Sequence, residues 1–128
     1  MRKIAANYIF PADSVPIHNG FVEIDSKGTL TNFGKLERET PSTEFYNGII
    51  CIVPKANYNL SSMKDDLMEL QTKHPEKALE EMVRTICKKY TDSSAPHSIT
   101  PNKEIILIDS IDFQNMKITS ESIIKRLI

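Results

Sequence analysis

The sequence predicts an α+β fold in which strands from both ends of the chain share one sheet system and two helices lie between them. Short apolar runs separated by turn residues fill the first half of the chain. In the middle, apolar residues recur at the helical spacing of three and four, and short apolar runs return near the end. A doubly wound fold is not expected, because strands and helices do not alternate along the chain.

Length and composition indicate one ordinary domain. The chain has 128 residues, 40% of them hydrophobic and 26% charged, and 16 Lys and Arg balance 17 Asp and Glu. We therefore expect residues 1–128 to form a single domain with a real core. The near-zero net charge favours neither nucleic acid nor an acidic membrane as a partner. A chain of this length is also too short for a (β/α)8 barrel, which needs about 250 residues.

The first strands are expected between about residues 2 and 53. An apolar run at residues 4–10 forms the first of them. Strands at 21–24 and 29–33 form a hairpin around the turn 25–28 (DSKG), because its glycine supplies the positive φ that the turn needs.

A fully buried strand is expected at residues 49–53 (IICIV), directly after the turn signal Asn47-Gly48. The two cysteines, Cys51 in this strand and Cys87 in a predicted helix, are expected to be buried free thiols. The N-terminus carries no signal-peptide pattern, and no apolar stretch approaches the roughly 20 residues that span a membrane. These features predict a cytoplasmic protein without a membrane partner.

Two helices are expected between about residues 62 and 90. Ser61 or Ser62 caps the first one, with Asp65 placed as in a capping box, and Pro75 begins the second. Their apolar faces either pack on the sheet or meet a second subunit, and the sequence does not decide between these roles. The candidate interface residues on these faces are Leu67, Leu70, Leu79, Met82, Val83 and Ile86.

The C-terminal strands are expected at about residues 104–128. Residues 104–108 form a buried strand, and residues 116–119 and 122–128 form two shorter ones. A loop rich in Ser, Thr and Pro at 91–101 connects them to the helices.

No local motif for catalysis or metal binding is present. His18, His74 and His97 have no ligand spacing, and the chain has no CxxC, GxGxxG or P-loop motif. We therefore expect no cofactor, no catalytic residue and no small-molecule substrate. Aromatic side chains are expected to pack in the core, and these are Tyr8, Phe10, Phe21, Phe33, Phe45, Tyr46, Tyr58 and Tyr90.

Segments from both ends of the chain follow a recognisable pattern. Residues 2–10 (RKIAANYIF), 17–25 (IHNGFVEID) and 43–51 (TEFYNGIIC) form an opening strand, a hairpin and a further strand. Residues 106–113 (ILIDSIDF) and 125–128 (KRLI) form the end of the pattern. Together they resemble bacterial metal-dependent amidohydrolases of the chlorohydrolase and nucleobase-deaminase type.

The resemblance implies a fold. Members of that family pair a catalytic barrel with a small β-sandwich-like composite domain, which is built from their N- and C-terminal segments. This chain resembles the composite domain alone, with two helices where the barrel would be. In the family the first barrel strand ends in a metal-binding H-x-H motif, and here Asn57 and Asn59 occupy the two histidine positions. An amide is a poor substitute for imidazole at zinc or iron, so the resemblance implies that metal binding is lost.

These observations predict a non-catalytic, barrel-less remnant of an amidohydrolase that acts as a structural or protein-interaction module. A homodimer is expected, because surfaces that cover a barrel in the family need another cover. Two alternatives stay open: a regulatory or binding partner of an intact amidohydrolase, and a decayed product without a selected function. A residual metal hydrolase is the least favoured interpretation.

Overall fold

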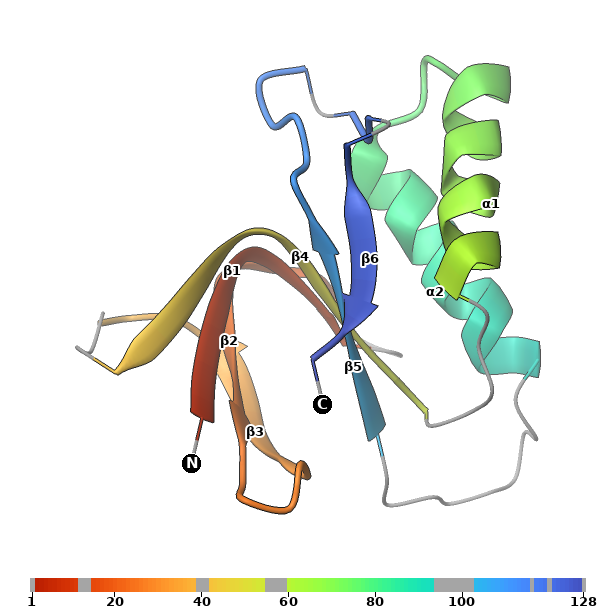
Figure 1. Ribbon diagram of the computed structural model, residues 1–128. Helices are drawn as coiled ribbons and strands as arrows, with labels where there is room; N and C mark the ends of the chain where they lie inside the picture. Colours follow the sequence, from red (N-terminus) through yellow and green to blue (C-terminus); the bar gives the residue numbers. More distant parts are fainter. Residues whose placement is uncertain are drawn as a thin grey trace.

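The computed structural model describes most of the chain as one sheet with two helices (Figure 1). The described residues are 2–11, 15–38, 42–54, 60–93, 103–115, 117–119 and 121–127. Both helices lie on the same side of the part of the sheet that contains the C-terminal strands (Figure 1). The predicted α+β class, with two helices between N-terminal and C-terminal strands, is therefore confirmed.

The sheet has six strands in the order β3-β2-β1-β4-β5-β6. They are β1 (Arg2–Pro11), β2 (Ile17–Ile24), β3 (Leu30–Lys35), β4 (Thr43–Pro54), β5 (Lys103–Asp109) and β6 (Ile123–Arg126). The β1 and β4 strands run parallel, and every other neighbouring pair is antiparallel. Pairing of β4 with β5 joins the two ends of the chain into one sheet, as the sequence predicts.

The helices are α1 (Leu60–Lys73) and α2 (Leu79–Ser93). They differ from the prediction at their starts. Ser62 lies inside the first turn of α1 and not at its cap. Pro75 lies in the turn between the helices, where the N–H of Lys77 donates to the carbonyl of His74 at 3.0 Å. Because residues 74–77 form this turn, α2 begins at Leu79 and not at Pro75.

The prediction of a strand at residues 116–119 is wrong. Lys117 forms only an isolated bridge with Asp112. The side chain of Gln71 in α1 takes the place of a neighbouring strand, because its amide N–H donates to the carbonyl of Ile118 and its oxygen accepts from the N–H of the same residue, both at 2.8 Å. A helix side chain therefore satisfies the backbone of this segment.

The sheet bends sharply where β1, β2 and β4 cross its middle (Figure 1). At this point β4 has one extra residue relative to β1, because the register shifts between Ala6 and Tyr8. Asn47-Gly48, predicted as a turn, instead lies inside the continuous β4 strand. Gly48 is required there, because a Cβ would overlap the carbonyl oxygen of Ile108 in β5. We call the part of the sheet beyond this bend, formed by residues 2–6, 20–24, 30–35 and 43–46, the outer arm.

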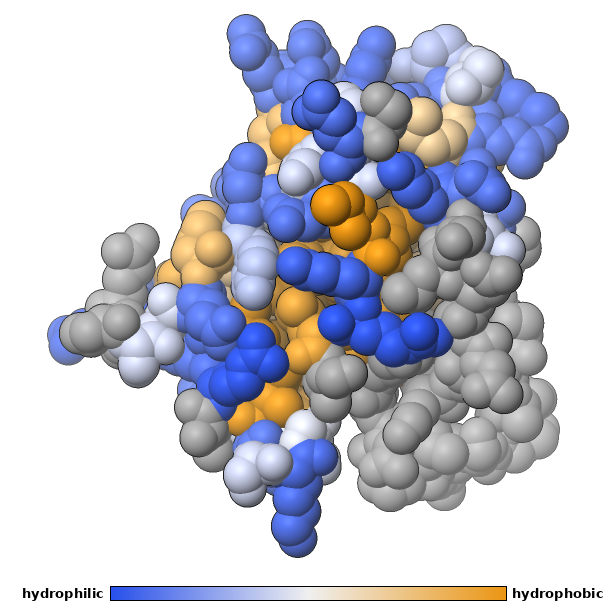
Figure 2. All heavy atoms as spheres, viewed as in Figure 1, coloured by the Kyte–Doolittle hydropathy of each residue, from blue (hydrophilic) through white to orange (hydrophobic). Residues whose placement is uncertain are grey.

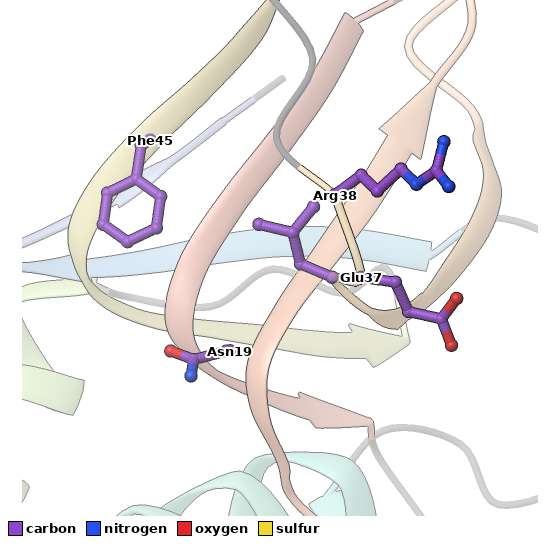
Figure 3. Close-up of a pocket in the computed structure, with 5 residues that line it drawn as sticks. Asn19, Glu37, Arg38 and Phe45 are labelled. Carbon is purple, nitrogen blue, oxygen red and sulfur yellow. The ribbon is translucent and has the colours of Figure 1, made fainter.

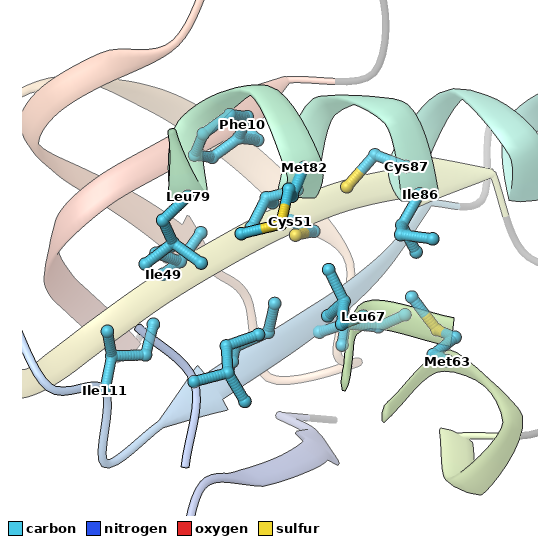
Figure 4. Packing of buried hydrophobic residues seen from close by; sticks show 14 of the residues in the cluster. Phe10, Ile49, Cys51, Met63, Leu67, Leu79, Met82, Ile86, Cys87 and Ile111 are labelled. Atoms are coloured by element: carbon cyan, nitrogen blue, oxygen red, sulfur yellow. The ribbon is translucent and has the colours of Figure 1, made fainter. Parts of the chain in front are cut away.

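Two buried clusters lie on opposite faces of β4 and β5. Alternation along β4 separates them. The helix-side core contains Phe10, Ile49, Cys51, Val53, Met63, Leu67, Leu79, Met82, Val83, Ile86, Cys87, Ile106, Ile108, Ile111 and Ile118 (Figure 4). The inner core contains Ile4, Ala6, Ile9, Val22, Ile24, Ile50, Ile52, Ile105, Leu107 and Leu127. The inner core lies where the bent sheet folds over itself, a sandwich-like arrangement of the kind that the resemblance implies.

Polar side chains close the open side of the inner core. The Arg2 guanidinium binds the Glu44 carboxylate through two hydrogen bonds, of 2.9 and 3.0 Å, and donates a third to the carbonyl of Leu127 at 3.0 Å. The Lys125 ammonium lies 5.3 Å from the centre of the Tyr46 ring. Figure 2 shows hydrophilic side chains extending across a strip of apolar ones in the middle of the molecule.

Candidate interaction surface

The apolar helix residues that the sequence offers as an interface lie against the sheet of their own chain. Within this set, five side chains are at most 3% exposed in the helix-side core, and these are Leu67, Leu79, Met82, Val83 and Ile86. Leu70 is half-buried and packs against the same cluster. The sequence leaves open whether these residues pack on the sheet or meet a second subunit, and the structure places them on the sheet. The five buried side chains are therefore not available to a second subunit.

Asn57 and Asn59, at the positions of the family's H-x-H motif, lie outside the described residues. Across the described segments, no three His, Cys, Asp or Glu side chains gather as a group that would hold a metal ion.

Two of the histidines have described neighbours, and each neighbour is a local structural contact. The His18 ring lies 4.8 Å from the Tyr8 ring, centre to centre, across the paired strands β1 and β2. The Nδ1 atom of His74 lies 3.4 Å from the Glu76 carboxylate in the turn between the helices. His97 lies outside the described residues.

The two cysteines are buried and unbridged, as predicted. Cys51 in β4 faces Cys87 in α2 within the helix-side core (Figure 4). A hydrogen bond to the Cys87 thiol, together with burial, raises the pKa of Cys51 well above its ordinary value. The thiol therefore stays protonated and behaves as a small apolar group.

Exposed aromatic side chains mark the outer arm. Phe45 in β4 is 54% exposed and Phe33 in β3 is 40% exposed, so the prediction that these rings pack in the core is wrong. The reason is positional. The rings lie beyond the bend, whereas α1 and α2 pack on the strands on the other side of it. No helix of the described chain contributes to the cover of this arm.

A shallow hollow of about 300 Å³ lies beside Phe45. Asn19, Leu36, Glu37 and Arg38 line the rest of it. Figure 3 shows the charged ends of Glu37 and Arg38 pointing away from the Phe45 ring. Apolar groups therefore contribute much of the wall of the hollow.

The local backbone explains how this hollow forms. Asn19 adopts φ 53°, a left-handed conformation that asparagine tolerates better than most residues. Its carbonyl accepts a hydrogen bond of 2.7 Å from the N–H of Leu36. This bond extends the pairing of β2 and β3 by one residue and holds the segment after β3 beside the sheet.

The two sheet edges differ. β3 forms one edge and β6 the other. The β6 edge is four residues long and contains Lys125 and Arg126, which discourage pairing with another chain. The β3 edge is six residues long, contains no proline, and has Lys35 as its one charged residue. It is the less protected edge.

Sequence reasoning missed Phe33 and Phe45. A signal for Phe33 was present, because polar residues surround it in β3 (LTNFGK) and give no apolar alternation. No comparable signal existed for Phe45, since its exposure depends on where the sheet bends.

No family model, no curated protein and no solved structure matches the chain. No helix in the described parts of the chain is long and apolar enough to cross a lipid bilayer.

Proposed function

We propose that this protein is a non-catalytic protein-interaction module that self-associates through its outer arm. The observation that carries the proposal is the contrast in cover between the apolar helix faces and the aromatic rings of the outer arm. The apolar faces of α1 and α2 are already buried within the chain, whereas Phe33 and Phe45 are exposed on the arm. Phe33 lies on the edge strand β3, and an edge strand that presents free backbone groups and an exposed aromatic ring is a ready template for pairing with another chain.

We also propose that the module derives from the composite domain of a metal-dependent amidohydrolase. Two features support this origin. The N-terminal and C-terminal strands share one sheet through the pairing of β4 with β5, and the sheet encloses a sandwich-like inner core. The two helices occupy the connection that would contain the barrel in that family.

Native mass spectrometry across a dilution series tests self-association directly. We expect the wild-type chain to form a dimer that dissociates on dilution and contains no bound metal. A wild-type chain that stays monomeric at every concentration would contradict self-association. One metal ion per chain would contradict the non-catalytic interpretation.

Two double variants test whether the outer arm forms the contact. Phe33→Ser with Phe45→Ser removes both exposed rings of the arm. Val15→Ser with Ile123→Ser is the matched control, because these side chains are 79% and 54% exposed but lie outside the arm. We expect the arm variant to raise the dimer dissociation constant by tenfold or more, as loss of a buried aromatic anchor does at interfaces (about 1.4 kcal/mol per tenfold). An equal effect of both variants would place the contact elsewhere.

A further inference from the structure

The hydrogen-bonding groups of β3 alternate between its neighbour β2 and the open edge. The bond from Leu36 N–H to the Asn19 carbonyl sets the phase, because bonded and non-bonded pairs alternate along an antiparallel ladder. In the register of β2 and β3, Gly34 pairs with Phe21, and this is a bonded pair by alternation. The N–H and C=O groups of Phe33 and Lys35 therefore point away from β2, toward the open edge.

We propose that β3 pairs antiparallel with β3 of a second copy of this chain, with Phe33 opposite Lys35 of the partner copy. This inference rests on the proposed self-association and names the segment that carries it. A two-fold axis then places Lys35 opposite Phe33 as well, so the contact is self-complementary. Each Phe33–Lys35 pair exchanges two backbone hydrogen bonds, and the outward groups of these residues in both copies find partners.

The side chains favour this register. Phe33 and Lys35 lie on the same face of β3, so each exposed ring would lie beside a lysine of the other copy. Two contacts of a lysine with an aromatic ring lie within the described part of the chain: Lys3 lies 4.6 Å from the Phe21 ring centre and Lys125 lies 5.3 Å from the Tyr46 ring centre. The two Phe33 rings become diagonal neighbours, which aromatic side chains can bridge.

The same register places Gly34 opposite Gly34 of the second copy, at the two-fold axis. This pair is non-bonded in the new ladder, so its Cα atoms would lie about 4.5 Å apart. A Cβ at Gly34 meets only the Phe21 ring of its own chain, at 3.6 Å, which is ordinary contact. A cysteine fits there without strain.

Cysteine cross-linking tests the register. Gly34→Cys is expected to form an inter-chain disulfide in oxidised glutathione, because the Cα separation lies in the range that a disulfide spans. Asn32→Cys is the matched control on the same face of the same strand. It would face Leu36 of the partner copy, with its own counterpart about 13 Å along the strand. Non-reducing mass analysis should show a covalent dimer for Gly34→Cys alone. No cross-link in either variant, or equal cross-linking in both, would overturn the register.

A proline substitution tests the edge independently. Lys35→Pro removes an outward N–H but none of the bonds to β2, and proline is accepted at edge strands in this position. We expect it to raise the dimer dissociation constant at least about tenfold, whereas Lys35→Ala, which keeps the N–H, should have a smaller effect. Circular dichroism and thermal unfolding check that both variants fold. If Lys35→Pro does not fold, the comparison of Gly34→Cys with Asn32→Cys decides whether β3 pairs with β3.

The outcomes separate this inference from the proposed function. A wild-type monomer contradicts both. A wild-type dimer that Lys35→Pro leaves intact, with no Gly34→Cys cross-link, overturns β3 pairing and preserves self-association. If Phe45→Ser alone then weakens that dimer, the contact lies at the hollow beside Phe45 and not at the β3 edge.

Discussion

The helix-side core and the inner core bury opposite faces of the same two strands with different kinds of side chain. Each buries one face of β4 and β5. The helix-side core contains Met63, Met82 and the two cysteines, whereas the inner core consists of aliphatic side chains, most of them isoleucine. A helix lying on a sheet leaves irregular gaps that flexible sulfur side chains fill. Two layers of one bent sheet instead present regular rows, which stiff β-branched side chains pack well.

The two cores are also closed differently. On the helix side, Gln71 holds the backbone of Ile118, and the buried Ser122 hydroxyl accepts from the N–H of Thr119 and donates to the carbonyl of Ser110. These bonds are partly buried. The inner core is closed by the exposed Arg2–Glu44 pair. Neutral bonds in a partly buried site resist changes of pH and salt, whereas an exposed ion pair is screened.

The largest predicted effect comes from the helix-side core. Leu67→Ala should reduce the free energy of unfolding by about 2–5 kcal/mol, because Leu67 is fully buried and its loss leaves a cavity. Urea denaturation measures the change, and Leu70→Ala in the same helix, at a half-buried position, should cost less. Hydrogen exchange should rise first in α1 and α2. Equal acceleration in the outer arm would show that the two cores unfold as one unit.

A smaller effect is expected where α1 holds the C-terminal segment. Gln71→Ala should cost about 1–3 kcal/mol, since it leaves the N–H and C=O of Ile118 without their partner. Thr72→Ala is the adjacent control, because its hydroxyl bonds to the carbonyl of Met68 within the same helix. Thermal unfolding of the two variants gives the comparison. Equal stability would mean that water replaces the lost amide at no cost.

The smallest effect on stability is expected at the Arg2–Glu44 ion pair beside the inner core, and this effect depends on pH. A hydrogen bond from Arg2 lowers the pKa of Glu44 from its ordinary value of 4.5. A lowered pKa means that this stabilisation is complete above about pH 4.5 and is lost as the pH falls through the lowered pKa. Because the side chains are 47% and 41% exposed, we expect only about 0.2–1 kcal/mol.

Glu44→Gln isolates this contribution. The difference in unfolding free energy between the wild type and Glu44→Gln should be present at neutral pH and vanish in acid. High salt should reduce it as well, since exposed charges are screened. A difference that persists unchanged in acid would assign the role of Glu44 to packing and not to charge.

Local patterns in the sequence were sufficient for most of the elements. The apolar run 49–53 predicts the buried part of β4, and the spacing of Leu79, Met82, Val83 and Ile86 predicts the buried face of α2. Both signals are periodic and local, so neighbouring residues determine them. The prediction of a strand around Ile118 was wrong, because the hydrogen-bond partner of this segment, Gln71, is distant in the chain.

The candidate surface could be predicted only in part. The sequence analysis proposed the apolar faces of the two helices as a possible interface, but these faces pack on the sheet of the same chain. The exposed rings of Phe33 and Phe45 have the same residue type as the half-buried Phe21. Residue type alone cannot separate them.

The spacing of apolar residues along short stretches is enough to predict the α+β class, the helical period and the burial of Cys51 and Cys87. The packing of distant segments decides that the sheet bends near Gly48, that α1 and α2 cover one side of the bend, and that β3 is an edge strand among the described residues. The reason is that cover depends on which distant segments meet, and a close approach such as that of Gly48 to Ile108 exists only once β4 and β5 pair.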